Sequence, residues 1–73
     1  MARAEIHQAA ELSGDAARLE TYLGNTYFVE GNLPPAVEHY RRAVEFDPDD
    51  PGLKENLERA MRKLVAEERS GNP

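Results

Sequence analysis

Small and apolar residues recur along the middle of this chain at the spacing of α-helices. Leu23 and Tyr27 stand four positions apart. Ala36, Tyr40 and Ala43 follow at steps of four and three. Residues at these steps lie on one face of a helix, one above the other. The pattern therefore predicts two helices that pack through these faces, with Tyr40 filling the space between its two small neighbours.

Glycine and proline residues mark where these two helices begin and end. Gly31 can adopt the left-handed conformation that ends a helix, and Asn32 can cap the next one. Pro34 and Pro35 fit the first turn of the second helix, where backbone N–H groups lack partners within the helix. Pro48 forces the residue before it out of the helical region. We expect a helix–turn–helix unit.

The same residues resemble the motif of a tetratricopeptide repeat. The matching positions are Leu23-Gly24, Tyr27, Ala36, Tyr40, Ala43 and Pro48. The resemblance covers Ala17 to Asp50, and it implies that Gly24 allows a second helix to approach closely. Glu20 departs from the pattern, because the family usually has Trp or another large apolar residue there. We therefore expect the start of the first helix to be looser than usual.

The segment before the repeat is predicted to be a leading helix over residues 1–12. Ala2, Ile6 and Ala9 precede Ala36, Tyr40 and Ala43 by thirty-four positions, so the leading helix is in register as the second half of a preceding repeat. Ser13-Gly14-Asp15 is predicted to form a turn, in which Ser13 or Asp15 caps the following helix.

A closing helix is predicted over residues 51–68, followed by a flexible tail over residues 69–73. Asp50 can cap this helix, and Pro51 suits its first position. Its apolar stripe consists of Leu53, Leu57, Met61 and Leu64. We thus expect one all-α domain over residues 1–68, with about four antiparallel helices that form a fragment of a tetratricopeptide repeat solenoid.

Composition excludes several functions for the chain. Nine Lys and Arg against fourteen Asp and Glu give a formal charge of −5, which disfavours nucleic acid and anionic membranes as partners. The absence of cysteine excludes disulfides and thiolate metal sites. The sequence lacks an apolar run long enough for a membrane helix or a signal peptide. We expect a soluble chain, with the cytoplasm favoured, while the parent protein could still carry a membrane anchor.

Catalytic, cofactor and metal sites are not expected. His7 and His39 lie on different predicted helices without the spacing of a metal motif, and His39 is expected to face solvent. Ser13 and Ser70 fall in a turn and in a tail, which argues against a catalytic serine. We therefore interpret the chain as a non-enzymatic protein.

The family resemblance implies a concave peptide-binding groove on the first and closing helices. The implied groove residues are Arg18, Thr21, Asn25, Phe28, Val29, Asn56, Arg59, Arg62 and Lys63. Asn25 would hydrogen-bond a peptide backbone, and the basic residues would favour an acidic or carboxylate group. In the alternative, these basic residues simply pair with glutamates along their helix. Chaperone-binding members of the family clamp two carboxylates with lysines, arginines and asparagines, but Thr21 stands where that clamp has a lysine.

Two functions are therefore left open. In the first, the chain is an interaction module that presents part of a groove to a peptide or protein partner. In the second, it is an assembly element that forms a weak homodimer through its exposed ends, near Ile6 and Val65. The stretch from Leu23 to Asp50, together with the later NLERA, is also similar to repeats in bacterial aerotolerance-operon proteins.

Overall fold

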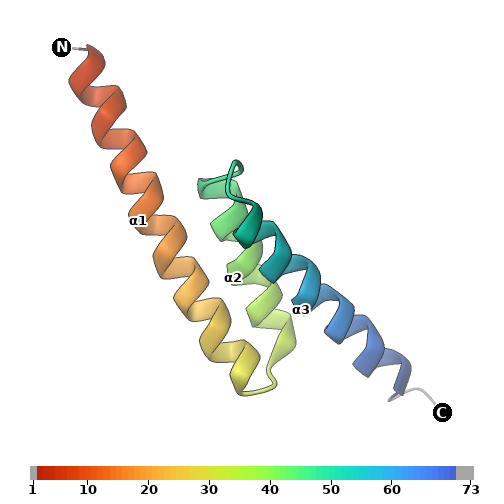
Figure 1. Cartoon of the computed structure of the whole chain (residues 1–73). Helices are drawn as coiled ribbons and strands as arrows, with labels where there is room; N and C mark the ends of the chain where they lie inside the picture. Colours follow the sequence, from red (N-terminus) through yellow and green to blue (C-terminus); the bar gives the residue numbers. More distant parts are fainter. Residues whose placement is uncertain (1, 71–73) are drawn as a thin grey trace.

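The computed structural model describes the backbone of residues 2–70 and the side chains of residues 14–70. It contains three helices, α1 (Ala2–Val29), α2 (Leu33–Phe46) and α3 (Pro51–Ser70). Successive helices run in opposite directions, so that α1 and α3 are roughly parallel, and the first turns of α1 extend beyond α2 (Figure 1). The described residues are all-α, without strands, as the sequence predicts.

The prediction of a separate leading helix is wrong, because α1 is continuous through the expected turn at residues 13–15. The described chain therefore has three helices and not four. Gly14 lies within α1, and a single glycine costs a helix only about 1 kcal/mol relative to alanine. Asp15, which was expected to cap a new helix, instead pairs with Arg18 on the next turn. The side chains of Ala2, Ile6 and Ala9 lie outside the described residues.

The turn between α1 and α2 follows the sequence prediction at Gly31. Gly31 has a φ of 80°, and its N–H donates to the carbonyl of Phe28 at 3.0 Å. The N–H of Asn32 donates to the carbonyl of Tyr27 at 2.9 Å. These two bonds form a Schellman motif, which satisfies carbonyls that the end of the helix leaves free. Asn32 takes the N-cap position of α2, but its side chain makes no capping hydrogen bond.

The turn between α2 and α3 is also capped as the sequence predicts. Asp47 ends α2, and its N–H donates to the carbonyl of Ala43 at 3.0 Å. The side chain of Asp50 accepts a hydrogen bond from the N–H of Gly52 at 2.9 Å. A carboxylate at this position satisfies one of the free N–H groups at the start of α3.

The core is organised around the ring of Tyr40, which is 2% exposed. Gly24 faces this ring so closely that a Cβ on the glycine would lie 2.6 Å from Tyr40 Cδ1. Phe28 tilts against the ring from α1, with 6.4 Å between centroids, and Ala60 of α3 joins the same cluster. The buried apolar residues are Ala17, Leu33, Ala36, Tyr40, Ala43 and Ala60. The small residues let α1 and α3 pack closely on either side of α2.

His39 does not face solvent as expected. Its Nδ1 lies 2.7 Å from the carboxylate of Glu20, and both side chains are mostly buried, at 18% and 15% exposure. The imidazole also stacks on Tyr27, with ring centroids 5.5 Å apart and planes 3° from parallel. Glu20, which replaces the usual apolar residue of the motif, thus joins α1 to α2 through a polar contact.

Candidate functional site

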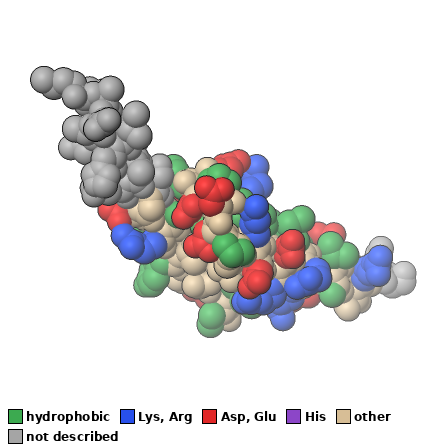
Figure 2. Space-filling view, turned by 45° about the horizontal axis from the view of Figure 1, so that its top comes forward, with side chains coloured by type: hydrophobic (Ala, Val, Ile, Leu, Met, Phe, Trp, Pro, Cys, Tyr) green, Lys and Arg blue, Asp and Glu red, His purple; other side chains and the backbone are tan. Residues whose placement is uncertain are grey.

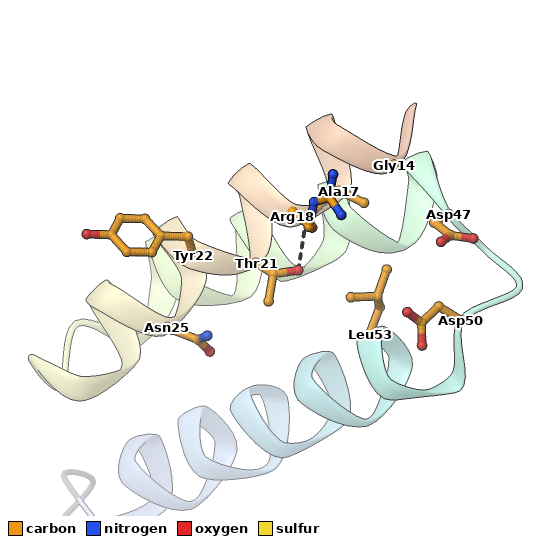
Figure 3. A pocket seen from close by; sticks show the side chains of 9 residues that line it. All are labelled: Gly14, Ala17, Arg18, Thr21, Tyr22, Asn25, Asp47, Asp50 and Leu53. Atoms are coloured by element: carbon orange, nitrogen blue, oxygen red, sulfur yellow. Dashed lines mark hydrogen bonds between the residues drawn. The ribbon is translucent and has the colours of Figure 1, made fainter. Parts of the chain in front are cut away.

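A pocket of about 560 Å³ opens between α1 and the beginning of α3 (Figure 3). Its lining residues are Gly14, Ala17, Arg18, Thr21, Tyr22, Asn25, Asp47, Asp50 and Leu53. One wall is a stripe along α1, and the other combines the α2–α3 turn with the first turn of α3. Leu53 points from α3 toward α1 and supplies an apolar surface opposite Ala17.

Three of the predicted groove residues line this pocket: Arg18, Thr21 and Asn25. They lie on successive turns of α1, because positions three or four apart share one face of a helix. The hydroxyl of Thr21 donates to the carbonyl of Ala17 at 2.8 Å. Arg18 projects outward and pairs with Asp15. The polar rim on α1 is therefore partly held in place by local contacts.

Asn25 connects the pocket to the core. Its side-chain oxygen accepts a hydrogen bond from the hydroxyl of Tyr40. This bond satisfies the hydroxyl of the buried tyrosine. It uses the oxygen of the Asn25 amide and not the NH₂ group, which donates hydrogen bonds. Among the described residues, no further hydrogen bond involves the Asn25 side chain. The NH₂ group of Asn25 is therefore available to donate a hydrogen bond to a peptide backbone.

The remaining predicted residues lie outside the pocket, toward the other end of α1 and along α3. The ammonium of Lys63 lies 6.0 Å from the centroid of the Phe28 ring, so these two residues meet between α1 and α3. Val29, the last residue of α1, is 85% exposed. Asn56 is half-buried, and Arg59 and Arg62 are exposed.

The basic residues of α3 are only partly neutralised. Lys63 lies 4.0 Å from the carboxylate of Glu67. Within residues 14–70, neither Arg59 nor Arg62 has an ion-pair partner, so the predicted pairing with glutamates along the helix is limited to Lys63. Burial raises the pKa of the Tyr40 hydroxyl, and the nearby Arg59 guanidinium partly opposes that rise in the pKa. The guanidinium of Arg59 therefore lies close enough to the Tyr40 hydroxyl to act on it electrostatically.

Three further lining residues were not predicted from the sequence: Asp47, Asp50 and Leu53. Asp50 was interpreted as a cap, and Asp47 as the residue that Pro48 forces out of the helical region. Leu53 was assigned to the apolar stripe of the closing helix. The signal was nevertheless present in the order of the elements. Because α1 and α3 run in the same direction, the start of α3 must lie beside the start of the repeat on α1.

Charge is distributed unevenly over the molecule. Figure 2 shows Lys and Arg side chains gathered along one edge toward the C-terminal end, with acidic and apolar side chains mixed across the rest of this face. The pocket itself carries Asp47 and Asp50 at one side, whereas Arg59, Arg62 and Lys63 follow along α3.

Comparison with known proteins agrees with this architecture. The family model of the tetratricopeptide repeat matches residues 17–50, which covers most of the pocket wall on α1 and all of α2. The chain therefore carries a tetratricopeptide repeat over residues 17–50. It is also similar to Stress-induced-phosphoprotein 1 of Caenorhabditis elegans, with 34% identity over 61 residues. That alignment covers 84% of this chain and 19% of the relative.

No solved structure matches the chain significantly. The resemblance to bacterial aerotolerance-operon proteins stays a prediction. The repeat and its helical architecture indicate a protein–protein interaction module. Within the described residues, none of the helices is sufficiently long and apolar to span a membrane.

Proposed function

We propose that this tetratricopeptide repeat chain binds a segment of a partner protein in the groove between α1 and α3. The observation that carries this proposal is the pocket of about 560 Å³, which joins an apolar wall to a polar rim. Its volume falls within the range of about 300–1,000 Å³ that is typical of ligand sites. The apolar wall of such a site accepts an apolar side chain of the partner segment. The polar rim offers hydrogen bonds to the residues beside that side chain.

The groove walls are held in place by the core behind them. Gly24 and Tyr40 fix the distance between α1 and α2, and Ala60 packs α3 against the same cluster. Asn25 is oriented by its bond to Tyr40. A site formed on packed helices loses little conformational freedom when it binds, and this preorganisation favours affinity. The preorganised site therefore favours the binding of a short partner segment.

The proposal is tested with peptides selected by display against the intact chain. Tyr22 lines the pocket and is 68% exposed, so Tyr22→Ala removes a contact surface without opening the core. We expect this variant to weaken binding roughly tenfold, the loss typical of truncating a contact that contributes more than about 1 kcal/mol. The measurement is calorimetric titration of one selected peptide, together with circular dichroism of the free variant.

Leu19→Ala is the matched control. Leu19 also lies on α1 and is 58% exposed, but it does not line the pocket. We expect its affinity for the same peptide to equal that of the unmodified chain. Equal losses in the two variants, or no loss in either, would place the binding site elsewhere.

Self-association is a second candidate function, favoured by exposed apolar residues on α3. Met61 and Val65 are 48% and 50% exposed, and they lie one helical turn apart. Repeat stacking normally covers such a surface, and a second copy could cover it here. Ile6, the other predicted contact, lies outside the described side chains. Sedimentation at several concentrations decides: a mass that rises toward that of a dimer supports this function, and a constant monomer mass excludes it.

A further inference from the structure

The two ends of the groove between α1 and α3 carry opposite charges. At the pocket end, Asp47 and Asp50 face the space beside Leu53 (Figure 3). At the far end, Lys63 lies over Phe28, and Arg59 and Arg62 precede it on α3. The acidic and the basic groups therefore lie at opposite ends of the groove and do not form one cluster.

Within residues 14–70, no ion pair neutralises the negative charge at the pocket end. Arg18 lines the same pocket, but it pairs with Asp15. Asp50 uses one oxygen to accept the Gly52 N–H, which leaves its charge in place. Among the described residues, neither Asp47 nor Asp50 forms an ion pair. A cationic group entering the pocket would therefore meet two available carboxylates.

The pocket also offers apolar surface next to these carboxylates. Leu53 is half-buried, and it points across the pocket toward the part of α1 that carries Ala17. Lysine and arginine combine an aliphatic stem with a charged head, so one such side chain can contact both kinds of surface at once. This combination favours an apolar or basic end of a partner segment over an acidic one.

The distance between the two ends sets the length of the segment. Asp50 caps α3 and Lys63 lies further along the same helix, and at about 1.5 Å per residue these two charged residues are separated by roughly 20 Å. An extended peptide covers that distance with about six or seven residues. The separation is also about twice the screening length of 8–10 Å at physiological salt, so each end attracts its own charge independently.

We propose that the groove binds an extended peptide segment of unequal charge in one orientation. The basic and apolar end of the segment occupies the pocket beside Asp47, Asp50 and Leu53. Its acidic end lies against Arg59, Arg62 and Lys63. This inference rests on the proposed function of the groove, and it specifies the chemical class and orientation of the ligand.

The first test locates each end of a bound probe. The probe is a seven-residue peptide with two lysines and a leucine at one end and two glutamates at the other. A nitroxide is attached to either end, and its effect on the amide signals of the intact chain is measured by NMR. With the label at the basic end, we expect broadening around Asp47 to Leu53. With the label at the acidic end, we expect it around Phe28 and Lys63.

The second test changes one charge in the α2–α3 turn. Asp47→Asn removes a carboxylate that lines the pocket, whereas Asp49→Asn removes an exposed carboxylate of the same turn that does not line it. The two variants have the same net charge. We expect Asp47→Asn to weaken the probe about two- to fivefold, the range of a single exposed charge pair, and Asp49→Asn to leave the affinity unchanged. A probe with glutamines in place of both lysines should not distinguish the two variants.

The outcomes separate this inference from the function on which it rests. Equal broadening at both ends of the groove, or equal losses in the two variants, would overturn the fixed orientation while binding in the groove stands. Failure of the probe to bind would also overturn the inference. In that case, display-selected peptides that depend on Tyr22 would still support the groove, and their independence of Tyr22 would exclude it.

Discussion

Gly14 and Gly24 lie in the same helix but have different surroundings. A Cβ on Gly24 would lie 2.6 Å from Tyr40 Cδ1 and 2.7 Å from Cε1, whereas a Cβ on Gly14 would meet nothing within 4 Å. Glycine costs a helix about 1 kcal/mol relative to alanine wherever the helix has room for a side chain. At Gly24 the ring occupies that room, so overpacking outweighs the gain in helix propensity.

The same substitution should therefore have opposite effects at the two positions. Gly14→Ala should raise the free energy of unfolding by up to about 1 kcal/mol. Gly24→Ala should lower it by about 1–3 kcal/mol. Urea denaturation followed by circular dichroism measures both changes. A destabilised Gly14→Ala variant would indicate a turn at that position, and a stabilised Gly24→Ala variant would contradict the close contact with Tyr40.

At the scale of elements, the sequence predicted best where a local rule decides the structure. Gly31 and Pro48 end helices because of their backbone constraints, and these constraints act regardless of the rest of the chain. The predicted turn at Gly14 was wrong, because an isolated glycine permits a turn without requiring one. His39 was misplaced because its partner, Glu20, lies on another helix. Contacts of that kind depend on how helices are rotated against each other, which spacing alone does not specify.

The candidate site shows the same division between local and long-range information. Arg18, Thr21 and Asn25 could be placed on one face of α1 from their spacing, and they do line the pocket. Asp47 and Leu53 could not, because they reach the pocket only through the path of the α2–α3 turn. The assignment of Asn25 was also incomplete: its spacing gave the face, whereas its bond to Tyr40 required the packed pair of helices.

At the scale of the whole molecule, the order of the helices brings the repeat and the following helix together into one surface. Because α2 lies between them in the chain, α1 and α3 run in the same direction (Figure 1), and the pocket opens between α1 and the start of α3. Exposed Arg41 and Arg42 lie on α2, where they pair with Glu38. The exposed arginines of α2 thus form a second charged surface, separate from the groove between α1 and α3, to which a partner segment can bind instead.

The most direct measurement of the central claim is the map of amide chemical shifts when a display-selected peptide is added to the isotopically labelled chain. We expect shifts concentrated along α1 between Arg18 and Phe28, and in the α2–α3 turn and the first turns of α3. We expect little change around Arg41 and Arg42. Shifts concentrated on α2 around these two arginines, with the pocket residues unchanged, would contradict the claim that the groove between α1 and α3 is the binding site.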